Sequence, residues 1–190
     1  MPKIDLAAVP AHKGSTYPAP FDAPCADRIR QRLGDAGDLN DFGVNLMRLP
    51  PGAWSSQRHW HSREDEFLYV IAGELTLIED GAETVLRAGD CVAFAKNIPN
   101  GHHLINKSDT MAVYLDIGTR SADDVTVYSD IDMKISSADD LFVHNDGTPY
   151  PARQVRTIAI PGTLLPASWR VTTSSSNATL KPAPSAQRAI

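Results

Sequence analysis

Residues 59–73 have the sequence HWHSREDEFLYVIAG, and this segment carries the strongest structural signal in the chain. Alternate residues of an extended segment point to the same face, so His59 and His61 direct both imidazoles to one place. The polar loop 62–65 lets the chain turn back and bring Glu66 beside them. Two imidazole nitrogens and a carboxylate oxygen suit a borderline divalent cation such as Zn²⁺, Fe²⁺ or Mn²⁺. The segment therefore predicts a metal site, because burying Glu66 without a cation would be costly.

The residues on either side of this segment form short apolar runs separated by turns. Pro50-Pro51-Gly52, Asp80-Gly81 and Gly89-Asp90 are turn signals, and Asp-Gly is typical of a hairpin. Short strands with a turn every eight to twelve residues or so, about the spacing found here, are typical of an all-β sandwich or barrel. The predicted strands span residues 44–49, 66–72, 74–78, 83–87, 91–95, 102–106 and 111–117, with edge strands at 125–128 and 141–143.

A fourth metal ligand is expected from a later strand, and the segment 99–106, PNGHHLIN, offers two histidines. His102 has the same strand parity as Leu104 and Asn106, whereas His103 has the parity of Ile105. Each face carries an apolar residue, so parity leaves both histidines open as the ligand.

The spacing of these residues resembles the two motifs of the cupin superfamily. The first motif corresponds to Gly52, His59-x-His61, four residues, Glu66, six residues and Gly73, and the second to Gly89-Asp90 through Gly101, His102, three residues and Asn106. The segment 142–150 is also similar to the ending of small single-domain bacterial cupins. The resemblance implies a single double-stranded β-helix, or jelly-roll, barrel, and it favours His102 over His103 as the fourth ligand.

The same resemblance implies one divalent metal ion (Zn, Mn, Fe or Ni) bound by His59, His61, Glu66 and His102. Such an ion acts as a Lewis acid on a carbonyl or carboxylate. One fold hosts many chemistries, but this ligand set favours a metal-dependent isomerase or lyase acting on a small, oxygenated, anionic metabolite. Glu66 is the predicted catalytic residue, because a cupin metal ligand can double as a base. The alternatives are a non-catalytic cupin that binds a sugar or effector, and an Fe(II)-dependent dioxygenase.

Three residues near the ligands are predicted to contact substrate. Gln57 has the parity of His59 and would face the same lumen, Arg58 flanks the ligands and would steer an anion, and Tyr114 lies on the polar face of its strand. Phe67 and Tyr69 have the opposite parity to Glu66, which predicts a position on the outer face or at a dimer interface. Because cupin barrels commonly pair through their outer sheets, the resemblance also implies a homodimer.

The ends of the chain differ from the barrel, which is predicted to span residues 41–150. Prolines at positions 2, 10, 18, 20 and 24 predict an irregular N-terminal arm over residues 1–40. Within it, residues 26–33 are expected to form a short helix with Arg28, Arg30 and Arg32 in solvent. Residues 151–190 lose the strand rhythm and become rich in Ser, Thr, Ala and Pro, which predicts a partly flexible C-terminal extension.

Composition excludes several other classes of protein. The 190 residues carry a formal net charge of −5 without a basic stripe, which argues against nucleic acid as a partner. No run approaches the ~18 apolar residues of a membrane span, and the first residues do not resemble a signal peptide. The two cysteines, Cys25 and Cys91, are far apart and are predicted to be free thiols. These features favour a cytoplasmic protein whose partner is a small molecule, with no membrane or nucleic-acid partner.

Overall fold

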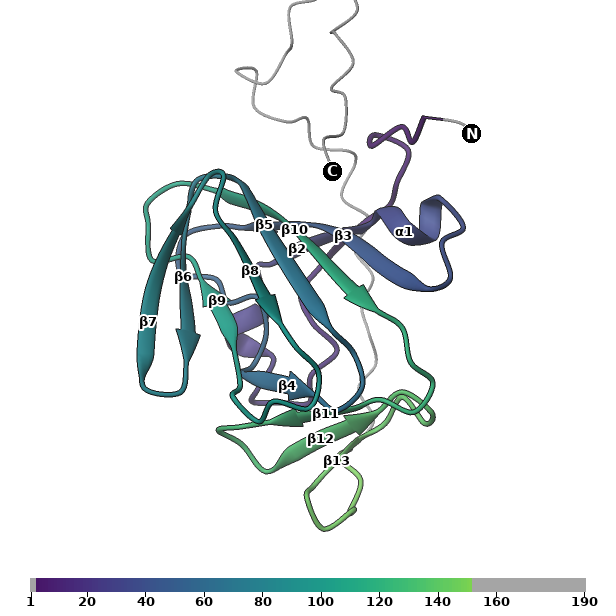
Figure 1. Ribbon diagram of the computed structural model, residues 1–190. Helices are drawn as coiled ribbons and strands as arrows, with labels where there is room; N and C mark the ends of the chain where they lie inside the picture. The colour runs from purple at the N-terminus through teal and green to yellow at the C-terminus, as the bar shows by residue number, and fades with distance from the viewer. Residues whose placement is uncertain (1–2, 152–190) are drawn as a thin grey trace, which may run out of the picture.

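The computed structural model describes residues 3–151, which form an almost entirely β structure (Figure 1). All the strand pairs in this range are antiparallel. The largest sheet contains, in spatial order, β1 (Ala11–Lys13), β2 (Ile29–Arg32), β3 (Phe42–Leu49), β10 (Ala112–Thr119), β5 (Glu66–Ala72) and β8 (Cys91–Phe94). The prediction of an all-β fold is therefore confirmed.

Two smaller sheets complete the barrel. One contains β7 (Ala82–Arg87), β6 (Glu74–Glu79) and β9 (His103–Ile105), and the other contains β13 (Phe142–Val143), β12 (Met133–Ser136), β11 (Val125–Tyr128) and β4 (His59–His61). A backbone bridge between His59 and His102 joins β4 to the residue that precedes β9. The two small sheets are thus continuous at this bridge, and Figure 1 shows β11, β12 and β13 grouped at one end of the barrel.

The barrel core lies between the large sheet and the β6–β7–β9 sheet. Leu68 and Val70 of β5 pack into one apolar cluster with Leu75 and Leu104 from the opposite sheet. The neighbouring positions in β5 face outward, as strand alternation requires. Phe67 is 38% exposed and Tyr69 is 41% exposed, so both lie on the outer face with the parity that the sequence predicts.

Turns are formed where the sequence places glycine. Gly81 in the Asp80-Gly81 hairpin has a φ of +73°, a conformation that costs other residues free energy. Gly73 has a φ of +77°, and a Cβ atom there would lie 2.8 Å from the carbonyl oxygen of Met111. The motif glycine at position 73 is therefore required both by its backbone conformation and by the close approach of the next strand.

The predicted strands within residues 41–143 all occur, with ends that differ by one or two residues. The patterns do not predict β1, β2 or β12. The expected helix over residues 26–33 is wrong, because Ile29–Arg32 is strand β2, paired with β3, and the short helix α1 spans Leu33–Ala36. Backbone pairing with a formed sheet outweighs the weak local preference of so short a segment for helix.

The N-terminal arm is more regular than its prolines suggest, since β1 and β2 extend the large sheet. The 3-10 helix η1 (Ala23–Cys25) lies between them. Tyr17 and Cys25 of the arm form a second apolar cluster with Tyr128 and Met133. The arm is therefore packed against the β11–β12 end of the barrel. Both cysteines are free, with Cys25 buried and Cys91 exposed, which confirms the prediction of two thiols.

Between residues 3 and 151, no helix is long and apolar enough to cross a membrane. The predicted C-terminal extension, residues 151–190, falls outside the described residues apart from its first position.

Candidate metal centre

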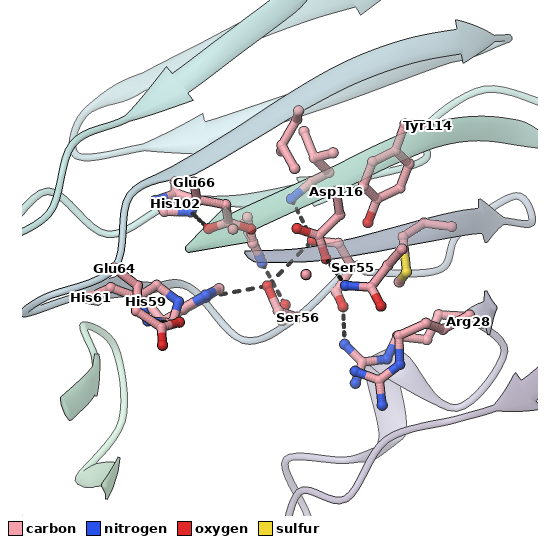
Figure 2. Close-up of a pocket in the computed structure, with 18 of the residues that line it drawn as sticks. Arg28, Ser55, Ser56, His59, His61, Glu64, Glu66, His102, Tyr114 and Asp116 are labelled. Atoms are coloured by element: carbon pink, nitrogen blue, oxygen red, sulfur yellow. Dashed lines mark hydrogen bonds and ion pairs between the residues drawn. The ribbon is translucent and has the colours of Figure 1, made fainter. Parts of the chain in front are cut away.

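Three of the predicted ligands converge in the structure. One ligand atom each from His59, His61 and Glu66 lie within 4.8 Å of one another, and all three side chains are partly buried. His59 and His61 are the two ends of β4, and Glu66 is the first residue of β5. The loop between the two strands therefore brings the carboxylate beside both imidazoles, as the spacing predicts. Figure 2 shows the three side chains grouped on one side of a cavity.

The backbone bridge between β4 and residue 102 places His102 with this group. The amide of His59 donates to the carbonyl of His102 at 3.2 Å, and the amide of His102 donates back at 2.9 Å. Residues directly opposite each other in an antiparallel pair have side chains on the same face. Their rings are accordingly adjacent, with centroids 5.0 Å apart. This pairing directs His102 to the face that His59 and His61 occupy.

His102 contacts the group through a hydrogen bond with Glu66. Its Nε2 lies 2.8 Å from Oε2 of Glu66, and its ring stacks on Phe94 with centroids 3.5 Å apart. Among the described residues its buried Nδ1 has no hydrogen-bond partner. The ring is thus oriented by the stack on Phe94, with one nitrogen directed at the Glu66 carboxylate.

His103, the alternative ligand, takes part in different contacts. Its Nδ1 lies 3.0 Å from the carbonyl oxygen of Ser56, and its ring meets the Trp54 ring edge-on at 4.6 Å. The side chain is buried, with 5% of its surface exposed. A buried Nδ1–H that donates to a carbonyl is a structural contact, and His103 belongs to the cavity wall outside the group of ligands.

A hydrogen bond at Nδ1 of each β4 histidine determines which ring nitrogen faces the candidate metal centre. Nδ1 of His59 lies 2.9 Å from the carbonyl oxygen of Gln57, and Nδ1 of His61 lies 2.7 Å from Oδ2 of Asp124. Both partners accept hydrogen bonds, so Nδ1 carries the proton and Nε2 is left free as a ligand. The donor set therefore fits a divalent cation in its tautomers as well as in its residue types.

The electrostatics of His59 and Glu66 agree with that assignment, whereas burial of His61 is outweighed by the Asp124 hydrogen bond and the nearby carboxylates, which raise its pKa. Burial lowers the pKa of His59 to about 3, which keeps its imidazole neutral. Burial opposes the charge on Glu66, but the hydrogen bond from His102 and the nearby imidazoles outweigh it and hold its pKa well below the usual range. A neutral imidazole and an ionised carboxylate are the forms that bind metal.

Asp124 belongs to the candidate site, although the sequence did not reveal it. It is 1% exposed, and besides His61 it accepts hydrogen bonds from the Ser62 hydroxyl and the Arg63 amide. Burial opposes its charge, but these contacts outweigh it and lower its pKa to about 2. His61, Glu64 and Asp124 form a second close group, but both Asp124 oxygens are already engaged. Asp124 therefore orients the His61 ring, and the first group is the candidate metal site.

Replacing Asp124 by asparagine is expected to weaken metal binding by about 10–100-fold, the usual cost of losing a carboxylate behind a histidine ligand. The amide is neutral and no longer favours the Nδ1–H tautomer of His61. Competition with a chromophoric chelator measures the affinity. Asp123→Asn is the matched control, because Asp123 is the exposed neighbour. Equal affinities in the two variants would contradict the orienting role.

The ligand group opens into a cavity of about 550 Å³ whose lining includes Tyr114 and Asp116. Tyr114 lies where the sequence predicts, facing the lumen from β10. Asp116 accepts a hydrogen bond from Asn45 at 3.2 Å. Burial and the adjacent Glu66 carboxylate raise the pKa of Asp116 to about 7. The cavity therefore holds a second buried carboxyl group next to the ligands.

Two predicted substrate residues lie elsewhere. The Gln57 amide donates to the carbonyl of Phe21 at 2.6 Å, because β4 starts at His59 and the parity does not extend back to Gln57. Arg58 forms ion pairs with Asp80 and Asp130, on the opposite side of the chain from His59. Neither residue lines the cavity. The arginines that do line it are Arg28, Arg30, Arg32 and Arg120, and three of these lie in the segment expected to be a solvated helix.

Comparison with known proteins matches residues 45–118 to the family model described as Cupin domain. No curated protein matches the chain. Residues 45–118 contain all four predicted ligands, so the match covers the site as well as the barrel.

Solved structures give a longer match. A sugar phosphate isomerase of the cupin superfamily from Silicibacter pomeroyi is 44% identical, with a TM-score of 0.75, over 80% of this chain and 98% of that one. A putative sugar phosphate isomerase from Acidithiobacillus ferrooxidans is 26% identical, with a TM-score of 0.63, over 76% and 89% of the two chains. A predicted oxalate decarboxylase from Thermotoga maritima is 19% identical, with a TM-score of 0.50 over 63% and 99%, and shares the fold alone.

These similarities agree with the two facing antiparallel sheets and confirm the predicted jelly-roll, or double-stranded β-helix, barrel. The identity with the Silicibacter protein extends over nearly the whole of that relative. The chain therefore belongs to the cupin superfamily.

Proposed function

We propose that this cupin is a metal-dependent isomerase whose substrate is a small sugar phosphate. The observation that carries the proposal is the convergence of His59, His61 and Glu66 at a cavity of metabolite size, with His102 in contact with the glutamate. The 44% identical relative is named as a sugar phosphate isomerase, which supports this chemistry over lyase chemistry. Pockets of about 300–1,000 Å³ are typical for small-molecule ligands.

The four predicted ligands would hold one divalent ion. When bound, the ion supplies a Lewis acid that polarises the oxygen atoms of a carbonyl or enediolate. The chain's own residues shape the remainder of the site. Tyr114 and Asp116 line the same cavity as the ligands, and Phe94 stacks on the ring of His102.

Isomerisation moves a proton between adjacent carbon atoms, so it needs a base in the cavity. Glu66 is the predicted base, but a carboxylate among three imidazoles and a cation holds a proton weakly. Asp116 supplies a second carboxyl group in the same cavity, positioned by its hydrogen bond with Asn45. We therefore include Asp116 with Glu66 as a proposed proton-transfer residue, on the grounds of its position.

Elemental analysis followed by a substrate screen in D₂O tests the proposal. Aldose and ketose phosphates are incubated with the metal-loaded protein, and NMR follows both product formation and deuterium uptake at the carbon next to the carbonyl. Interconversion with deuterium uptake is the expected result. Tight binding without turnover would support a binding cupin instead, and oxygen consumption with substrate would support a dioxygenase.

A cytoplasmic homodimer remains a prediction. The exposed Phe67 and Tyr69 on the outer face of β5 are consistent with pairing through that sheet. Sedimentation of the purified protein measures the oligomeric state directly.

A further inference from the structure

The cavity has a basic end that the metal centre does not use. Arg28, Arg30 and Arg32 line it from β2 and the residue before it, and Figure 2 shows Arg28 on the opposite side of the cavity from His59 and His61. Three arginines thus lie on one wall of a single cavity in a chain whose formal net charge is −5. Their arrangement therefore needs a physical explanation.

Strand pairing directs these side chains inward. Arg30 pairs with Met47 of β3, and Met47 pairs with Tyr114 of β10. Paired residues share a face of the sheet, and Met47 and Tyr114 both line the cavity. Arg28 and Arg32 lie two positions away on either side and share that face. Gln31, which has the opposite parity, instead donates to the carbonyls of Leu6 and Val9.

Arg30 pairs with no carboxylate among the described residues, although the nearby Asp116 carboxyl interacts with its charge. Over residues 3–151, no hydrogen bond or ion pair joins Arg30 to an acidic side chain. Arg28 donates to the neutral backbone carbonyls of Gly14 and Ser55. Arg32 lies 3.6 Å from Asp35, which also pairs with Arg120. The wall therefore carries a positive excess centred on Arg30.

A cation without a partner in a partly desolvated position is energetically costly unless a bound ligand supplies the opposite charge. Burial, together with the charges of Arg32 and Arg28, lowers the pKa of Arg30 to about 10, so the guanidinium is still charged at neutral pH. A planar guanidinium presents paired N–H donors that match the oxygen atoms of a phosphate. A dianion such as phosphate is thus the ligand that would neutralise the positive charge of this wall.

We propose that Arg30, flanked by Arg28 and Arg32, binds the phosphate group of the substrate at the end of the cavity opposite the metal centre. This assignment rests on the proposed function, in which the other end of the substrate reaches the metal ligands. Strands β2 and β5 are three strand spacings apart in the sheet, or about 14 Å along its surface. The curved sheet directs side chains from both strands into one cavity, so a short phosphorylated chain spans the two ends.

Calorimetric titration of inorganic phosphate into the full-length, metal-containing protein tests the assignment. Arg30→Gln is compared with Arg87→Gln, a matched control in which the removed arginine is a surface residue of β7 paired with Glu74. We expect phosphate affinity at least about tenfold lower in R30Q, because a charge-assisted pair is lost. The affinity of R87Q should stay within about twofold of wild type, because exposed pairs contribute little. Phosphate should also raise the Tm of wild type and R87Q but not that of R30Q.

Three results would overturn the subsite. Wild-type protein that binds no phosphate at millimolar concentrations would do so without any variant. An R30Q variant that binds phosphate like wild type would also do so. Phosphate affinity that follows the metal content rather than residue 30 would place the anion on the ion.

The phosphate subsite and the proposed function would be contradicted by different results. If R30Q loses phosphate binding but wild type isomerises no sugar phosphate, the subsite stands and the isomerase proposal falls. If wild type is an isomerase and R30Q keeps its KM, the subsite falls and the isomerase proposal stands. A rise in KM of at least about tenfold with a smaller change in kcat is the expected result for a group that anchors substrate away from the reacting atoms.

Discussion

Replacing His61 by alanine is expected to abolish metal binding and turnover together. The imidazole is one of the three convergent ligands, and its Nδ1 is held by Asp124 at 2.7 Å. Removing it deletes a ligand and leaves the buried Asp124 without its main partner. Metal stabilisation contributes several kcal/mol and each ~1.4 kcal/mol is a factor of ten, so activity should fall by at least about 1,000-fold. Elemental analysis and the D₂O isomerisation assay measure the two losses.

His144→Ala is the control for this experiment. His144 pairs with Asp132 and stacks on Tyr150, away from the cavity. Its replacement should leave metal content and activity unchanged. Full activity in a metal-free His61→Ala protein would eliminate metal-dependent chemistry for this chain, whatever the fold.

The second large effect distinguishes the adjacent histidines. We expect His102→Gln to lower metal affinity by at least about 100-fold and His103→Gln to change it by less than about threefold. His102 shares a face with His59 through the backbone bridge, whereas His103 is directed to Ser56 and Trp54. Losing a metal ligand should lower metal affinity at least as much as losing a group that is hydrogen-bonded to a ligand, for which a 10–100-fold loss is typical. Glutamine keeps a similar volume and an N–H donor in both variants.

Chelator competition measures the affinity of each variant, and thermal unfolding shows whether each remains folded. His103→Gln should lose only a modest part of its stability, because the glutamine amide can replace the donor to Ser56. The reverse order, with His103→Gln losing the metal and His102→Gln keeping it, would assign the fourth ligand to β9 and contradict the pairing argument.

The two histidines also show how far the sequence predicts the site. Local spacing identified His59, His61 and Glu66, because i and i+2 parity and a short loop are local properties. It did not choose between His102 and His103, since both parities carry apolar residues. The choice depends on which residue of the distant segment lies opposite His59, and only the assembled sheets define that partner.

The arginines show that the position of a residue in the sequence can predict the wrong surroundings. Arg58 was predicted to steer an anion because it is adjacent to the ligands in sequence, but alternation turns it away to Asp80 and Asp130. Arg30 was predicted to lie in solvent on a helix, but pairing of β2 with β3 turns it into the cavity. Adjacency along the chain and adjacency in the folded protein are different properties for residues on a strand.

The sequence by itself determined the all-β architecture, most of the barrel strands, the turn at Gly81, and three candidate ligands on one face. These depend on period-two alternation and on backbone conformations that favour glycine, which act over a few residues. Only the tertiary structure decided the position of His102, the role of Asp124 behind His61 and the inward face of Arg30. Each of these depends on contacts between segments many residues apart, whose register is set by the packing of the whole barrel.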